Sequence, residues 1–186
     1  MRLCRVYEVK MLIRKCIDWY LKHRNPINYA KKLGVTIGEN CRLNGSPNWG
    51  SEPWIISLGN HTEISFGCTF ITHDGATWVF REKEEYKGVV RFGKITIGDN
   101  CFIGANSTIL PGVHIGDNCI IGACSLVTKS VPHGEVWGGV PAHFITTTDK
   151  FASKCLEQTP DYDVAEFATN KKSAVKKMVG WSKGEK

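Results

Sequence analysis

The chain has 186 residues, of which 42% are apolar and 23% charged, and these ordinary globular values exclude wholesale disorder. It contains no run of about 18 apolar residues and no apolar leader at its start, so we expect a cytoplasmic protein without a membrane-spanning helix. The formal net charge is +6, concentrated in residues 1–34, but no nucleic-acid-binding motif accompanies it and we expect no nucleic-acid partner.

The first 34 residues are predicted to form an N-terminal helical segment. Apolar residues recur at helical spacing over residues 1–24, opposite a basic face, which indicates an amphipathic helix ending at Asn25-Pro26. Such a helix could pack against the base of the domain that follows, or it could make peripheral contact with a membrane surface. The sequence leaves both interpretations open.

A repeat of six residues dominates the middle of the chain. Aliphatic residues stand six apart without a slip, and small residues follow each of them four positions later. The aliphatic positions are Ile97, Ile103, Ile109, Ile115, Ile121 and Val127, and the small ones are Cys101, Ser107, Val113, Cys119, Ser125 and Val131. A less regular version begins at Ile37. A period of six fits neither an α-helix nor a simple amphipathic strand.

Six residues per strand and corner predict a prism with three flat faces, so the fold class is an all-β solenoid, a parallel β-helix over residues 35–146. Residues 18 apart should then stack, for example Ile97 on Ile115. The glycine after most aliphatics is expected to permit corner conformations closed to other residues. Cys41, Cys68, Cys101 and Cys119 occupy the small inward position, so we expect them to be reduced packing residues.

Two excursions break the repeat, at residues 44–54 and 75–94, and a polar, Lys-rich helical tail is expected over residues 147–186. Loops on a rigid scaffold often carry binding residues. Trp49, Trp54 and Trp78 lie in these excursions, where their flat rings could bind a sugar acceptor or could equally anchor the loops.

His73 is the candidate catalytic residue. It follows a strand-like stretch and opens the longer excursion beside Asp74, so a stiff wall could hold it while leaving it partly exposed. The ordinary pKa of histidine suits general-base work near neutral pH. His61 and His114 occupy repeat positions more typical of surface residues.

The string IGDNCFIGANSTILPGVHIGDNCIIGACSLVTKSVP, with GGVPAH after it, resembles the bacterial transferase hexapeptide family, and most of all its sugar and polysaccharide O-acetyltransferases. The resemblance covers roughly residues 35–146. It implies a left-handed β-helix, a homotrimer with active sites between neighbouring subunits, and acetyl-CoA as co-substrate for transfer to a sugar or glycan hydroxyl.

The resemblance also assigns residues. Thr72-His73-Asp74 matches the family's catalytic string, which implies that His73 is the general base; Asp74, or Glu63 in its place, could steady the imidazole. Matching positions imply donor contacts at Ala105 and Ala123 along the pantetheine arm, at Thr128 and Lys129 near the nucleotide, and at His143. His143 stands where the family usually has Lys or Arg, which puts that contact with the phosphate in doubt.

Three other functions are compatible with the same predicted fold. The acceptor could be an amine, as on an amino-sugar nucleotide. A γ-type carbonic anhydrase would need a zinc site with two histidines about five apart, and no two histidines here have that spacing, so we expect no metal. A non-catalytic assembly protein would have no use for the Thr72-His73-Asp74 string.

Overall fold

The structure, a computed structural model, describes residues 11, 13, 15–22 and 24–181. The chain divides into two compact units, Met1–Thr148 and Asp149–Lys186. Within the described part, no helix is long and apolar enough to cross a membrane. The predicted helix over residues 1–24 lies partly outside the described residues, and those described between 11 and 24 are helical.

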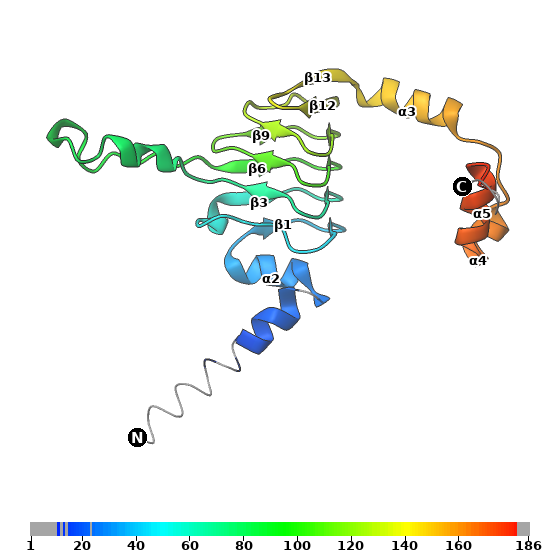
Figure 1. Cartoon of the computed structure of the whole chain (residues 1–186), viewed down its shortest axis with the longest axis horizontal. Coiled ribbons are helices and arrows are strands. Elements are labelled where there is room, and N and C mark those ends of the chain that lie inside the picture. Colours follow the sequence, from blue (N-terminus) through cyan, green and yellow to red (C-terminus); the bar gives the residue numbers. More distant parts are fainter. Residues whose placement is uncertain (1–10, 12, 14, 23, 182–186) are drawn as a thin grey trace. The chain divides into compact units, whose positions relative to one another are not determined.

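Short strands of the first unit form three sheets, called A, B and C, which are the three walls of the prism (Figure 1). Sheet A has the order β1 (Thr36–Ile37), β3 (Ile56–Leu58), β6 (Ile95–Ile97), β9 (His114–Ile115). Sheet B has the order β2 (Arg42–Leu43), β4 (Glu63–Ile64), β7 (Phe102–Ile103), β10 (Ile120–Ile121), β12 (Glu135–Gly139), β13 (Ala142–Thr147). Sheet C has the order β5 (Thr69–Phe70), β8 (Thr108–Ile109), β11 (Leu126–Val127).

Successive coils stack in the predicted register. Ile97 pairs with Ile115 in sheet A, and Ile103 pairs with Ile121 in sheet B, all in parallel. Among the strands that the structure describes, only the last pair, β12 and β13, is antiparallel. The repeated aliphatic side chains are buried and form the core of the prism. The predicted stacking of residues 18 apart is therefore confirmed.

The inward cysteines behave as predicted. Cys41, Cys68, Cys101 and Cys119 are buried free thiols, and they donate to backbone carbonyl oxygens of the wall, as Cys68 Sγ does to the Gly104 oxygen at 3.3 Å. Burial raises the pKa of the Cys68 thiol, which keeps it protonated.

The expected reason for the corner glycines is wrong. Gly104 does not have a positive φ; a Cβ built on it would lie 2.4 Å from the backbone nitrogen of Ala123 in the next coil. The left-handed conformation occurs two residues later, at Asn106, whose φ is 58°. Glycine is required because adjacent coils approach closely, and asparagine, which tolerates the left-handed region better than most residues, makes the turn.

The helical residues before the prism continue into α2 (Pro26–Leu33), which packs against β1 and β2. Asn25 ends the first helix and caps the second, because its side chain accepts a hydrogen bond from the Asn28 nitrogen. Ile13, Ile17 and Tyr20 are exposed on the first helix. Contact of this helix with a membrane surface stays a prediction.

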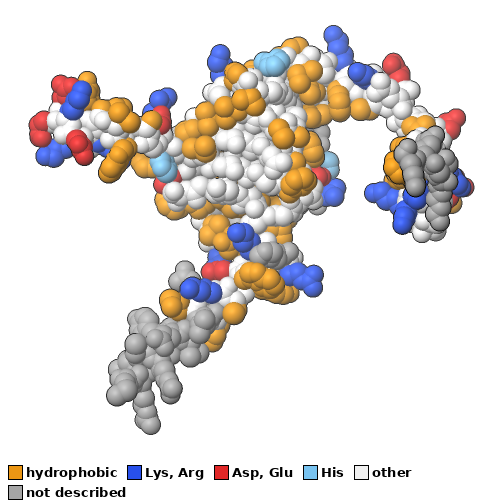
Figure 2. Space-filling model, viewed as in Figure 1, with side chains coloured by type: hydrophobic (Ala, Val, Ile, Leu, Met, Phe, Trp, Pro, Cys, Tyr) orange, Lys and Arg blue, Asp and Glu red, His pale blue; other side chains and the backbone are white. Residues whose placement is uncertain are grey.

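The excursions leave the prism at one corner, between sheets C and A. The first begins after Trp49 rather than at residue 44, because Asn48 still pairs with Thr69 of sheet C. The first contains the 3₁₀ helix η1 (Pro53–Ile55), and the second contains η2 (Gly75–Val79) and η3 (Glu84–Tyr86). Figure 1 shows the second, in green, extending away from the stacked coils, and Figure 2 shows side chains of both charges gathered on it. The second unit contains α4 (Val164–Thr169) and α5 (Lys171–Met178), packed on each other, after α3 (Thr148–Gln158).

Candidate active site

His73 lies where the longer excursion both begins and ends. The backbone nitrogen of Gly93 donates to the Thr72 oxygen at 2.9 Å, and that of Asp74 donates to the Arg91 oxygen at 2.9 Å. These bonds make an antiparallel bridge between His73 and Phe92, whose ring centres are 5.9 Å apart. The excursion is thereby closed at its base, and His73 is fixed at the corner of the prism with 41% of its side chain exposed.

Glu52, from the first excursion, holds the imidazole. Its Oε2 atom lies 2.9 Å from His73 Nδ1 and accepts a hydrogen bond from Thr72 Oγ1 at 2.6 Å. Asp74 does not make the expected contact with His73. Its carboxylate instead caps η2 through the Ala76 nitrogen and pairs with Arg91 at 3.5 Å, because residue 74 points away from residue 73 in extended backbone.

The ionised state of Glu52 sets the tautomer of a neutral His73 ring. The Thr72 hydroxyl, and after it the His73 ring, hold the pKa of the Glu52 carboxyl below its ordinary value of 4.5, against the opposing effect of burial. An ionised carboxylate can only accept hydrogen bonds, so the proton of a neutral His73 ring sits on Nδ1. The lone pair on Nε2 is then available to a substrate.

Two hollows meet at His73. One has a volume of about 470 Å³ and runs past Leu110 and Pro111 to Thr128, along the same corner in the following coils. The other has a volume of about 210 Å³ and lies against Glu52 and the excursion, including Arg81 and Arg91. His73 lines both, so its ring can contact two reactants at once.

The predicted donor-binding residues fall on two corners of the prism. Thr128 lines the larger hollow beside His73, and the exposed Lys129 follows it. Ala105 and Ala123 are stacked on a different corner, between sheets B and C, where the Cys124 nitrogen donates to the Ala105 oxygen. The turn that leads to His143 joins this second corner, because the Gly139 nitrogen donates to Ser125 Oγ. The predicted donor-binding residues therefore do not all lie together within one chain.

The three tryptophans predicted to bind substrate differ in how far they are exposed. Trp49 is 3% exposed and stacks on Phe70 inside the prism, with ring centres 4.9 Å apart, so its predicted contact with substrate is wrong. It stands six residues after Leu43, at the inward position, and this spacing was the signal for a core residue. Trp54 and Trp78 are 64% and 72% exposed, and their role stays a prediction.

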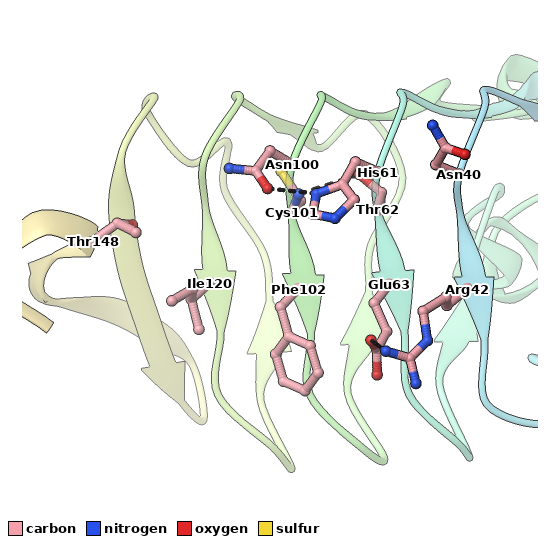
Figure 3. A pocket seen from close by; sticks show the side chains of 10 residues that line it. All are labelled: Asn40, Arg42, His61, Thr62, Glu63, Asn100, Cys101, Phe102, Ile120 and Thr148. Carbon is pink, nitrogen blue, oxygen red and sulfur yellow. Dashed lines mark hydrogen bonds and ion pairs between the residues drawn. The ribbon is translucent and has the colours of Figure 1, made fainter. Parts of the chain in front are cut away.

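A further hollow, of about 380 Å³, lies on the outer face of sheet B (Figure 3). His61 there contacts Asn100 Oδ1 at 2.8 Å, and Glu63 pairs with Arg42 at 3.3 Å. Glu63 therefore does not serve as the partner of His73. Among the residues that the structure describes, no cluster of three or more His, Cys, Asp or Glu side chains could hold a metal ion.

Glu52, Arg81 and Arg91 were not predicted as site residues. Arg91 and Arg81 lie in the excursion that His73 opens, so their position near the site could have been inferred. Glu52 precedes His73 by 21 residues rather than 18, because the excursions interrupt the repeat, so no regular spacing indicates it.

Residues 94–129 match the family described as bacterial transferase hexapeptide (six repeats). Protein CapG of Staphylococcus aureus is 52% identical over 134 residues, which are 71% of this chain and 76% of CapG. A maltose O-acetyltransferase from Clostridium difficile 630 shares the fold, with a TM-score of 0.53 at 21% identity over 72% of this chain and 83% of that chain. A galactoside acetyltransferase in complex with coenzyme A is 26% identical, with a TM-score of 0.53, over 76% of this chain and 82% of that chain.

The six-residue repeat, the prism it builds and the similarity to these proteins define a transferase built on a parallel β-helix. The chain belongs to the bacterial transferase hexapeptide family, and membership implies a left-handed coil. It is an acetyltransferase.

Proposed function

We propose that this enzyme transfers the acetyl group of acetyl-CoA to a hydroxyl of a sugar or glycan precursor, with His73 as the general base. The observation that carries the proposal is the 2.9 Å contact between His73 Nδ1 and Glu52, which turns Nε2 of the ring toward the junction of two hollows as the free nitrogen of a neutral imidazole. The similarity to a galactoside acetyltransferase that binds coenzyme A supports both the donor and the class of acceptor.

The chemistry requires one base and no covalent bond between the acetyl group and the enzyme. His73 Nε2 takes the proton of the acceptor hydroxyl as its oxygen attacks the thioester carbonyl carbon. The imidazolium that forms is stabilised by the Glu52 carboxylate beside Nδ1. When the tetrahedral intermediate collapses, the carbon–sulfur bond breaks, and the thiolate of CoA takes the proton back from His73. Binding both reactants at one histidine supplies the required orientation.

We also propose that the enzyme is a homotrimer, because the predicted donor-binding residues occupy two corners of the prism. The corner with His73 and Thr128 of one subunit would face the corner with Ala105, Ala123 and His143 of its neighbour. Acetyl-CoA would then lie between the two subunits, with its thioester beside His73.

Replacing His73 by alanine tests the assignment of the base. We expect transfer from acetyl-CoA to fall about 10²- to 10⁴-fold, because the hydroxyl loses its proton acceptor, while acetyl-CoA affinity measured by calorimetry changes little. His114→Ala is the matched control, since His114 contacts Thr96 on sheet A, away from both hollows. If His73→Ala kept more than a tenth of wild-type transfer, His73 would not be the base.

A further inference from the structure

Arg81 lines the smaller hollow at His73 without a carboxylate partner. Among the described residues it forms no ion pair; its guanidinium lies over the Trp78 ring, 5.8 Å from the ring centre. The residue is partly buried, and its backbone nitrogen is hydrogen-bonded to the Thr77 oxygen at 3.2 Å. A guanidinium held in this way presents donors to the hollow that the chain itself does not satisfy.

The two carboxylates that line this hollow already have hydrogen-bond or ion-pair partners within the chain. Glu52 Oε2 accepts from Thr72 and His73. Asp74 caps η2 with one oxygen and pairs with Arg91 through the other. The hollow therefore has acidic groups that are satisfied internally and one arginine that is not, which favours a ligand with a negative charge.

The phosphates of CoA are poor candidates for this arginine. Arg81 lines the same hollow as His73, the residue at which the thioester reacts. An uncharged pantetheine arm separates the thioester from the phosphates of CoA. An anion at Arg81 must therefore belong to the other reactant.

The size of the hollow limits what it encloses. Its volume of about 210 Å³ lies below the roughly 300–1,000 Å³ of pockets that surround drug-sized ligands. It fits one sugar ring with its substituents, while the rest of a longer glycan would remain outside.

We propose that the acceptor carries an anionic group, a sugar carboxylate or a phosphate, close to the hydroxyl that receives the acetyl group, and that Arg81 binds this anion. The proposal rests on the proposed O-acetyl transfer, because it names the class of acceptor for the same site. Arg81 is then a residue that selects the acceptor, while His73 performs the chemistry on it.

The test compares sugars that differ in charge on the same ring. Methyl glucoside, methyl glucuronide and glucose 1-phosphate would be titrated into the full-length protein saturated with CoA, and also offered as acceptors with acetyl-CoA. We expect at least one anionic sugar to bind about 10- to 100-fold more tightly than methyl glucoside, the range for a charged hydrogen bond. Preference for the glucuronide or for the phosphate identifies the source of the charge.

Arg81→Gln should abolish this preference while leaving the affinity for methyl glucoside unchanged, and Arg81→Lys should keep part of it. Arg42→Gln, on the outer face of sheet B, is the matched control and should behave as wild type.

Equal binding of charged and neutral sugars, or no binding of either anionic sugar, would overturn the proposal. So would an Arg81→Gln variant whose mass by light scattering differs from wild type, since Arg81 would then serve a subunit contact. An intact charge preference without transfer to any sugar would support the anion site and count against O-acetyl transfer.

Discussion

At the residue scale, the proposed base, His73, is held by a carboxylate that also accepts a hydrogen bond from a neighbouring hydroxyl. Glu52 accepts from the Thr72 hydroxyl and from the His73 ring, and these bonds lower the pKa of its carboxyl. The ionised form is therefore the one present at neutral pH. It fixes the tautomer of a neutral His73 ring and lies beside the positive charge that the ring would acquire in the proposed transfer.

Replacing Glu52 by glutamine should lower kcat about 10- to 100-fold, because the imidazolium loses a charge-assisted hydrogen bond. The KM for acetyl-CoA should change little, since Glu52 lines the acceptor side of His73. Steady-state kinetics on both substrates separate these effects. Glu63→Gln, which removes a carboxylate on the outer face of sheet B, should leave kcat unchanged. An equal loss in both variants would contradict a specific role for Glu52.

The lowered pKa of Glu52 also predicts how stability depends on pH. A carboxyl with a pKa below its ordinary 4.5 in the folded state stabilises that state above pH of about 4.5. This contribution is lost as the pH falls through the lower folded-state pKa. The free energy of unfolding of wild type and Glu52→Gln, measured by denaturant titration, should therefore converge under acidic conditions. If the difference in unfolding free energy between wild type and Glu52→Gln stayed constant from pH 7 to pH 2, the predicted contribution of Glu52 would be contradicted.

Individual residues show what the sequence could and could not predict. His73 was predicted from the strand and loop adjacent to it in the chain and from the family resemblance, and its catalytic role stays a prediction. Glu52 was not predicted, since its contact with His73 depends on how two irregular excursions fold at one corner. Trp49 was misinterpreted because its neighbours look like a loop, although its six-residue spacing from Leu43 places it in the core.

At the element scale, several corners of the prism divide two structural requirements between two residues. The first residue must have no side chain, because the next coil passes directly over it, as at Gly104. The second must adopt a left-handed conformation, as Asn106 and Asn118 do. The periodicity predicted the strands and their stacking, but spacing alone could not show that close approach, rather than φ, selects the glycine.

Gly104→Ala and Gly122→Ala separate these effects, since the two glycines occupy the same repeat position one coil apart. A Cβ at Gly104 would lie 2.4 Å from the Ala123 nitrogen, whereas the nearest atom to a Cβ at Gly122 is the Trp137 oxygen at 3.6 Å. Because backbone atoms cannot move aside cheaply, we expect Gly104→Ala to lose about 1–3 kcal/mol of unfolding free energy or more.

Gly122→Ala should change the free energy of unfolding by less than about 1 kcal/mol in either direction, because alanine fits there and restricts the unfolded chain. Denaturant titration of both variants, with circular dichroism as the probe, gives the comparison. Similar losses in the two variants would show that backbone conformation, and not the approach of the next coil, requires glycine.

At the scale of the whole molecule, the family and the prism were predictable because the repeat is local and regular. The family resemblance implied a site shared between subunits, but the sequence alone did not show which predicted residues fall on which corner, since that depends on which sheet each turn follows. His73 lies between sheets C and A, and Ala123 lies between sheets B and C. In the proposed trimer, a second copy supplies the half of the site that one rigid prism cannot bring to His73.

Complementation between two inactive variants tests this arrangement. His73→Ala removes the base, and Ala123→Phe should block the pantetheine arm on the other corner, so each variant alone should be inactive. Co-expressed with different tags and purified on both, the mixed trimers should recover about a third of wild-type activity per trimer, because a closed ring of three with two kinds of subunit contains one interface of the required order. Light scattering should give three times the 20.7 kDa subunit mass. Mixed trimers without activity would place the whole site within one subunit, and a mass near one subunit would exclude the shared site altogether.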